Sequence, residues 1–209
     1  MENLDKTADT IRQHMEQMNS ARDDAYTRSR QLISLCARSI RAIHREEWET
    51  AQSLIAEARA AAKTMVDGVA GYPNLYWAGY TQDALKEYVE ANLTYSLVRN
   101  EPLPLPDELG AEPSTWLNGL AEAATELRRR ILDIIRHGYS DEAERLLDVM
   151  DQIYSTLVTF DFSDGITGGL RRRTDTVRAV LERTRGDVTT SMRRSELEKA
   201  LKSLEAKLG

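Results

Sequence analysis

Cysteine, proline and glycine are scarce in this chain, and the scarcity of each narrows the range of structures. Of 209 residues, 1 is cysteine, 5 are proline and 11 are glycine. Cys36 therefore cannot form an internal disulfide, and its apolar neighbours Ile33, Leu35 and Ile40 indicate a core position in an intracellular protein. Few helix breakers in a sequence rich in Ala, Leu, Glu and Arg favour long helices.

Long apolar runs and an excess of basic charge are also missing. No apolar run approaches the length of about 18 residues that marks a membrane-spanning helix, and the polar start Met-Glu-Asn-Leu-Asp lacks a signal-peptide core. The formal net charge of -6 argues against a uniformly basic nucleic-acid surface. We therefore expect a cytoplasmic protein that does not contact a membrane.

Histidines and glycine-rich loops provide little catalytic chemistry here. His14, His44 and His137 share no spacing with one another or with Cys36, which argues against a zinc site. Neither acidic pair described below has a histidine at the Glu-x-x-His offset of a di-iron bundle. The segment 164–169 lacks the lysine of a phosphate-binding loop and is interpreted as a turn.

The periodicity of apolar residues predicts an all-α fold, a bundle of roughly six long helices in one domain covering residues 1–209. The expected helices cover residues 3–45, 46–69, 73–100, 113–137, 140–161 and 170–208. Prolines at 102, 104 and 106 predict an extended connector between the third and the fourth helix. Several of these helices far exceed the average of about 11 residues, so part of their apolar surface is expected at an oligomer interface.

Two pairs of glutamates at helix-face spacing form the strongest candidate site. Glu87 and Glu90 are separated by the spacing i,i+3, and Glu122 and Glu126 by the spacing i,i+4. Both spacings place side chains on one helix face, about 5–6 Å apart at Cβ. Like charges so placed repel unless a cation lies between them, and Mg²⁺ prefers carboxylate oxygens. The pairs therefore suggest a Mg²⁺ site, with Mn²⁺ as an alternative ion.

The competing interpretation is a solvated acidic surface, since charged residues make up 30% of the chain. Around the first pair the acidic residues form a narrow seam on an otherwise apolar helix, which favours burial. The second pair continues into Arg129, Arg130 and Asp133. This stripe is interpreted as surface, with Glu126 paired to Arg130.

Two further groups bear on nucleic-acid binding. Arg171, Arg172 and Arg173 are candidates for contacts to RNA phosphates, although a solvated face or salt bridges to a neighbouring subunit fit the pattern equally well. Four aromatic residues stand close together in the sequence: Tyr72, Tyr76, Trp77 and Tyr80. Their helical spacing is interpreted as core packing rather than as a platform for stacking bases.

Three segments resemble motifs of the translin/TRAX family, and the chain is more similar to TRAX, the translin-associated factor X, than to translin. Residues 86–91, Lys-Glu-Tyr-Val-Glu-Ala, look like the Glu-Tyr-Val-Glu-Ala motif of TRAX. Residues 116–127 are similar to the second TRAX motif, in which Tyr-Leu-x-Gly-Val-Ala-Asp precedes a Glu four residues later. Residues 170–175, Leu-Arg-Arg-Arg-Thr-Asp, resemble the Leu-Arg-Lys-Arg-Tyr-Asp segment of translin. The resemblance covers essentially the whole chain.

The resemblance implies an all-α subunit of a hollow octameric shell that takes up single-stranded RNA, built from copies of one chain or with a translin-like partner subunit. It further implies a Mg²⁺-dependent endoribonuclease that hydrolyses phosphodiesters with metal-activated water. Glu87, Glu90 and Glu126 match the TRAX carboxylates, and Glu122 stands where the family usually has Asp. All four are therefore expected to be metal ligands and catalytic residues.

Two alternatives stay open at this stage. One is a non-catalytic translin-like protein that binds RNA or single-stranded DNA and whose acidic seam is structural. The other is an all-α nucleoside triphosphate pyrophosphohydrolase of the MazG type, which also combines Glu-x-x-Glu with a second acidic pair, normally Glu-x-x-Asp. Cleavage of RNA, retention of RNA without cleavage, and release of pyrophosphate from nucleotides would distinguish the three functions.

Overall fold

The computed structural model describes residues 2–208, and every regular element in this range is an α-helix. The long helices are α1 (Glu2–His44), α2 (Trp48–Val69), α4 (Gly79–Arg99), α6 (Pro113–Ile135), α7 (Asp141–Leu157) and α9 (Leu170–Leu208). Short helices lie in the connections: α3 (Pro73–Tyr76), α5 (Pro106–Leu109) and α8 (Asp164–Thr167). The predicted all-α fold is confirmed. None of the helices in this range combines the length and apolarity needed to cross a bilayer.

Two of the expected helices differ from the prediction, one by a break and one by an early end. The helix expected over 73–100 is broken between α3 and α4, where Ala78 has extended backbone. Side chains replace the main-chain bonds at this break, since Thr81 Oγ1 donates to the carbonyl of Leu75 and Gln82 Nε2 donates to that of Tyr76, each over 2.8 Å. The helix expected to reach Asp161 stops at Leu157, and the β-branched residues that follow have low helix propensity.

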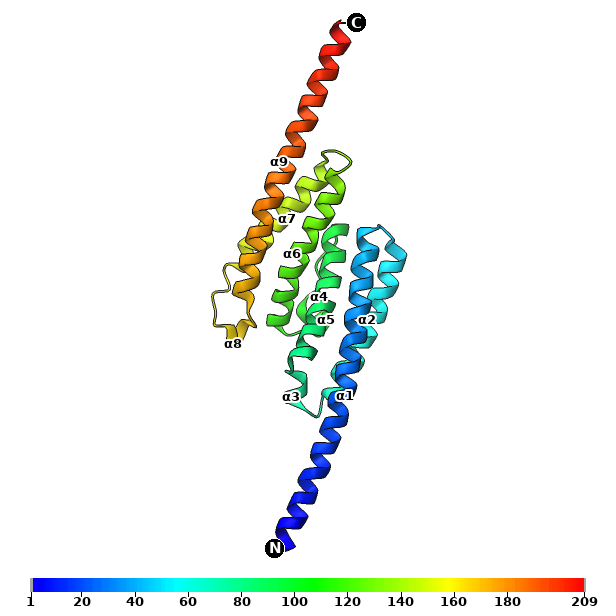
Figure 1. Ribbon diagram of the computed structural model, residues 1–209, viewed down its shortest axis with the longest axis vertical. Coiled ribbons are helices and arrows are strands. Elements are labelled where there is room, and N and C mark those ends of the chain that lie inside the picture. The colour runs from blue at the N-terminus through cyan, green and yellow to red at the C-terminus, as the bar shows by residue number, and fades with distance from the viewer. Residues whose placement is uncertain (1, 209) are drawn as a thin grey trace.

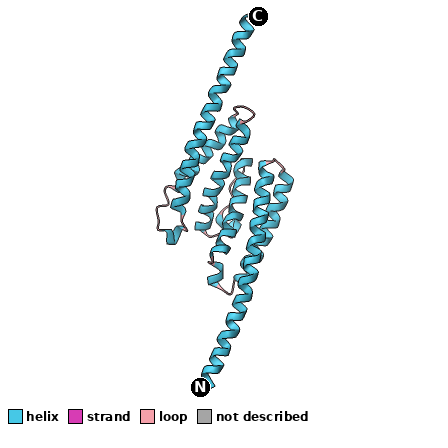
Figure 2. Cartoon of the chain, in the orientation of Figure 1, coloured by secondary structure: helices cyan, strands magenta, loops and turns pink. Residues whose placement is uncertain are grey.

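The long helices pack side by side across the molecule (Figure 1). α1 packs against α2 and α4, α4 packs against α6, and α6 packs against α7 and α9. Figure 2 shows the helices joined by loops, with an extended segment leading from α7 to α8. This order places α4 and α6 in the middle of the bundle, where both candidate acidic pairs are carried.

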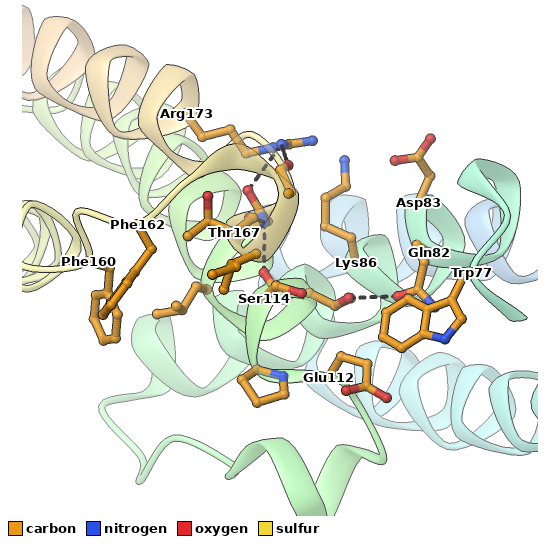
Figure 3. A pocket seen from close by; sticks show the side chains of 17 residues that line it. Trp77, Gln82, Asp83, Lys86, Glu112, Ser114, Phe160, Phe162, Thr167 and Arg173 are labelled. Atoms are coloured by element: carbon orange, nitrogen blue, oxygen red, sulfur yellow. Dashed lines mark hydrogen bonds between the residues drawn. The ribbon is translucent and has the colours of Figure 1, made fainter.

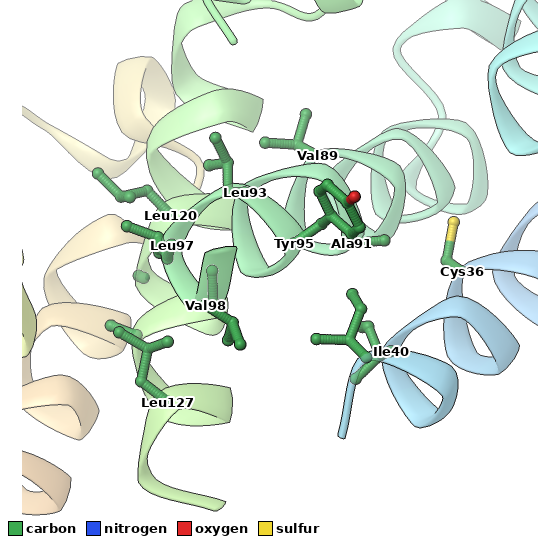
Figure 4. Close-up of a cluster of buried hydrophobic side chains, with 14 of the residues drawn as sticks. Cys36, Ile40, Val89, Ala91, Leu93, Tyr95, Leu97, Val98, Leu120 and Leu127 are labelled. Carbon is green, nitrogen blue, oxygen red and sulfur yellow. The ribbon is translucent and has the colours of Figure 1, made fainter. Parts of the chain in front are cut away.

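Helix α4 is enclosed by its neighbours along most of its length, and every residue from 88 to 98 is buried. Figure 4 shows Leu93 and Leu97 of α4 beside Leu120 of α6, with Cys36 of α1 on the other side. Cys36 is fully buried, which confirms its predicted core position. A polar residue on this part of α4 therefore lies inside the protein rather than on its surface.

The ends of α1 and α9 project from the bundle in opposite directions, with the two termini at opposite ends of the molecule (Figure 1). We call the projecting parts, residues 2–24 of α1 and 189–208 of α9, the terminal arms. Large apolar side chains on them are exposed: Leu4, Ile11, Met15, Leu197, Leu201 and Leu204. The excess apolar surface predicted for the long helices is therefore concentrated on these arms.

Candidate metal centre

Three carboxylates meet between α4 and α6. Glu87, Glu90 and Glu122 each offer one oxygen, and these oxygens lie within 4.8 Å of one another. The spacing i,i+3 aligns the first two on one face of α4, and the packing of α6 against that face adds the third. We call these three residues the carboxylate cluster. Their oxygens could hold a metal ion, as the first acidic pair predicted.

The close approach of the two helices depends on Gly119 of α6, one turn before Glu122. A Cβ atom at this position would lie 2.6 Å from Cγ1 and 2.8 Å from Cβ of Val89, and 3.1 Å from the main-chain oxygen of Lys86. These neighbours are a short branched side chain and backbone, which have little freedom to move. Glycine here therefore lets α6 reach the part of α4 that carries the carboxylates.

Glu90 is the most buried member of the carboxylate cluster, with 7% of its surface exposed. Burial, together with the charges of Glu87, Glu122 and Glu126, raises the pKa of its carboxyl from 4.5 to about 9. The charge of Lys86 offsets part of this effect. A divalent cation would favour the ionised form of Glu90 for the same electrostatic reason.

Two cations contact the same oxygen of the cluster. Lys86 Nζ lies 2.8 Å and Arg173 Nε 3.0 Å from Glu122 Oε1, and Lys86 Nζ lies 3.3 Å from Glu87 Oε1. Burial alone would lower the pKa of Lys86, but its hydrogen bond to Glu122 and the charges of Glu122 and Glu87 raise it overall. Sequence reasoning assigned no role to Lys86, although it stands in the quoted motif.

Glu126 is held by a histidine from α1, not by the arginine one turn along its own helix. His44 Nε2 lies 2.6 Å from Glu126 Oε2, and the His44 side chain is 3% exposed. The predicted pair of Glu126 with Arg130 is wrong, because Arg130 instead contacts Glu46 over 2.6 Å. The interpretation of the second acidic stripe as surface is also wrong for its two glutamates, since the side chains of Glu122 and Glu126 are only 26% and 27% exposed.

The three arginines at the start of α9 do not form one site. Consecutive residues on a helix point about 100° apart, so the side chains diverge. Arg171 is exposed and pairs with Asp161 over 2.8 Å, and Arg172 is exposed on the surface. Only Arg173 turns inward, where its NH1 also donates to Asn118 Oδ1 over 3.1 Å.

A cleft of about 560 Å³ opens beside the carboxylate cluster, and Lys86 and Arg173 form part of its wall (Figure 3). Trp77, Phe160 and Phe162 also line it. Trp77 is 57% exposed, so the interpretation of this residue as core is wrong. Trp77 directly follows α3, at the break before α4, so it is not part of the continuous helix that the spacing assumed.

No family model matches the chain. Comparison with solved structures finds AfC3PO, both alone and in complex with duplex RNA, at 30% sequence identity and a TM-score of 0.82. The similarity covers 89% of this chain, and 97% and 96% of the two AfC3PO chains, respectively. Apo-NeC3PO shares the fold, with a TM-score of 0.80 at 22% identity over 88% of this chain and 96% of its own.

A curated relative has similar length. The protein named "Uncharacterized protein MJ0175" from Methanocaldococcus jannaschii is 28% identical over 194 residues, which cover 92% of this chain and 86% of the relative. The similarity therefore extends across the bundle in both sequence and structure.

Proposed function

Because this chain belongs to the translin/TRAX family, to which C3PO also belongs, we propose that it is a TRAX-like, Mg²⁺-dependent endoribonuclease subunit. Its substrate in this proposal is single-stranded RNA, taken up by a shell of several subunits. One related structure, that of AfC3PO, contains RNA, here as a duplex. Membership of this family also disfavours the MazG-type alternative.

The carboxylate cluster is the observation that carries the enzymatic part of the proposal. Its donor set is hard oxygen, which suits Mg²⁺ or Mn²⁺. The raised pKa of Glu90 reflects burial and then the neighbouring carboxylates, whose charges a cation would compensate. In this proposal Glu87, Glu90 and Glu122 hold the metal. A bound Mg²⁺ would polarise the phosphate and lower the pKa of a coordinated water.

The residues around the cluster have complementary roles. Lys86 and Arg173 can exchange their contacts with Glu122 for the oxygens of a phosphate, since both are donors placed within 3.0 Å of that carboxylate. His44 fixes the orientation of Glu126 through the 2.6 Å contact. Glu126 then serves as a further ligand or as the group that orients the attacking water.

The terminal arms support assembly into a shell. Their exposed leucine, isoleucine and methionine side chains lie beyond the part of the bundle that other helices of the same chain cover. Burial of such surface between subunits is favourable by about 25 cal/mol per Å². We propose a homo-octamer, or an oligomer with a translin-like partner subunit.

The decisive experiment is cleavage of end-labelled single-stranded RNA by the purified protein, in Mg²⁺ and in chelator. Glu90→Gln and Glu122→Gln keep side-chain volume and remove the negative charge, so both are expected to abolish cleavage while leaving the assembly intact. Glu57→Gln is the matched control, because Glu57 is exposed on α2 and distant in sequence from both pairs. Wild-type cleavage rates in both cluster variants would show that the assignment is wrong.

A second candidate function is supported by the internal ion pairs. Lys86 and Arg173 already compensate the charge of Glu122, which suits a structural cluster in a non-catalytic RNA-binding shell. Under that function the protein would retain RNA without cleaving it in Mg²⁺. Added Mg²⁺ would then leave the thermal midpoint unchanged, whereas a metal that binds the folded state raises it.

A further inference from the structure

We propose that the cleft beside the carboxylate cluster binds one unpaired nucleobase of the RNA strand, and that the neighbouring phosphate lies against Lys86 and Arg173. This inference rests on the proposed function, because it adds a base-binding subsite to the same centre. Figure 3 shows the two cations at one edge of the cleft, with Trp77 on one side and Phe160 and Phe162 on the other.

The cleft and the carboxylate cluster share part of a wall. Lys86 and Arg173 line the cleft, and both contact Glu122 Oε1, over 2.8 Å and 3.0 Å. These two side chains therefore link the cleft to Glu122 of the carboxylate cluster. A nucleotide is a ligand of suitable chemistry, since it joins an anionic phosphate to a flat apolar ring.

Exposed aromatic side chains on both sides of the cleft can stack on the flat ring of a nucleobase. Trp77 is 57% exposed, Phe162 is 60% exposed and Phe160 is 36% exposed. The ring of Trp77 is held edge-on against Tyr76, with centroids 5.1 Å apart and planes at 84°. Stacking on such rings contributes about 1–3 kcal/mol per base and accepts every base, because each base has a π-face.

The two amide side chains of the cleft are already paired within the protein. Gln82 donates to the carbonyl of Tyr76 and accepts from Thr115 Oγ1, each over 2.8 Å. Asn118 donates to the carbonyls of Ser114 and Thr167 over 2.7 Å and accepts from Arg173. These groups have little capacity to read the edge of a base, so we expect little preference among the four bases.

The distribution of charge sets the direction of the strand. Glu112 lines the cleft near Trp77, and its carboxylate repels a phosphate at that end, whereas Asp83 lies at the edge with Lys86 (Figure 3). The phosphate is therefore directed to the end with Lys86 and Arg173, beside the carboxylate cluster. Bases in an A-form duplex are stacked and paired, so only an unpaired or extruded nucleotide can enter.

Binding of RNA in chelator tests the subsite without requiring cleavage. The probes are a single-stranded oligonucleotide and the same strand with abasic residues, each measured by fluorescence anisotropy. Trp77→Ala and Phe162→Ala are each expected to weaken binding of the intact strand by about fivefold or more. Trp77→Phe should retain most of the affinity, and Tyr26→Ala is the control for an exposed aromatic residue on α1.

The abasic strand should bind the wild type more weakly and be nearly insensitive to the two alanine substitutions. Equal affinity of wild type for both strands would overturn the proposal. The proposal would also be overturned if Phe162→Ala lowered the mass of the assembly and Phe162→Leu restored both the mass and the RNA affinity. The cleft would then be an interface between copies of the chain. Binding that depends on Trp77 without any cleavage in Mg²⁺ would keep the subsite and reject the nuclease. If Trp77→Ala and Phe162→Ala bind RNA as tightly as the wild type and still cleave it in Mg²⁺, the nuclease function would be kept and the subsite rejected.

Discussion

Helix α4 and the terminal arms differ in what surrounds them, and each carries residues that do not suit its surroundings. Residues 88–98 of α4 are all buried, yet this stretch includes the carboxyl of Glu90. The arms are exposed, yet they carry large apolar side chains, of which Leu4 is 66% and Leu197 60% accessible. One region places an ionisable carboxyl inside the protein, and the other places apolar surface outside it.

Both mismatches cost stability in the isolated chain. Burial disfavours the ionised carboxylate, and exposed apolar surface forgoes the hydrophobic stabilisation that burial provides. Sites that break the local rules of burial in this way are commonly functional. The buried carboxyl therefore connects α4 with metal binding, and the exposed apolar side chains connect the arms with assembly. Substitutions in α4 should change stability and metal binding, whereas substitutions in the arms should change the mass of the assembly.

The largest expected effect concerns the α9 arm. Replacing Leu197, Leu201 and Leu204 together by serine removes the apolar stripe there and should reduce the mass in solution at least twofold. Wild type should have a mass several times 23.7 kDa, measured by light scattering or sedimentation.

The matched control replaces Lys199 and Lys202 by serine on another face of the same arm. This variant should keep the wild-type mass, because its substitutions leave the leucine stripe intact. A wild type that is monomeric at micromolar concentration, or a triple-serine variant of unchanged mass, would break the link between the arms and assembly.

A smaller effect is expected where α6 approaches α4. Gly119→Ala places a methyl group against Val89 and should lower the free energy of unfolding by about 1–3 kcal/mol. It should also weaken the stabilisation by Mg²⁺, since the carboxylates of the two helices move apart. Gly186→Ala on α9 is the control, because nothing lies within 4 Å of its added Cβ, and it should stabilise by about 0.5–1 kcal/mol. Denaturant titration measures both.

Local patterns were sufficient to predict most of the fold. The periodic apolar residues and the prolines at 102, 104 and 106 predicted the six long helices, because these signals act within a few turns. The break before α4 was missed because it depends on side-chain bonds from Thr81 and Gln82 to carbonyls of α3. Such bonds replace the main-chain pattern that periodicity assumes.

The candidate site was predictable only in part, for the same reason. Glu87 and Glu90 align through helix geometry alone, so their spacing revealed them. The contact of His44 with Glu126 joins residues 82 positions apart, and that of Arg173 with Glu122 joins residues 51 positions apart. Both depend on how α1 and α9 pack against α6, which no local pattern encodes.

The pH dependence of stability sharpens the description of α4. The pKa of Glu90 is 4.5 in the unfolded chain and about 9 in the folded one, so between these values the folded state binds more protons. The contribution of Glu90 to the free energy of unfolding therefore falls as pH rises from about 5 to about 9 in chelator. Glu90→Gln should remove this slope and stabilise the protein at pH 8, where the buried carboxyl of the wild type opposes ionisation.

The control for this measurement is Glu57→Gln, whose stability should follow that of the wild type at each pH. Thermal or denaturant unfolding in chelator between about pH 5 and about pH 9 provides the data. A Glu90→Gln variant that is less stable than wild type at pH 8 would show that Glu90 is ionised and well compensated in the folded chain.

The smallest expected effect concerns two arginines within a single turn of α9, and tests whether burial determines how much each contributes to stability. Arg171 is 77% exposed at its side chain and Arg173 only 29%, although both pair with a carboxylate. Arg171→Ala should change the free energy of unfolding by less than about 0.5 kcal/mol, because exposed ion pairs contribute little. Arg173→Ala should cost more, since it leaves Glu122 with Lys86 as its remaining cation and removes the bond to Asn118. If Arg171 also contacts RNA, its loss should reduce the slope of log affinity against log salt by up to about 0.7 for a single strand. Equal losses of stability in the two variants would show that exposure does not separate these arginines.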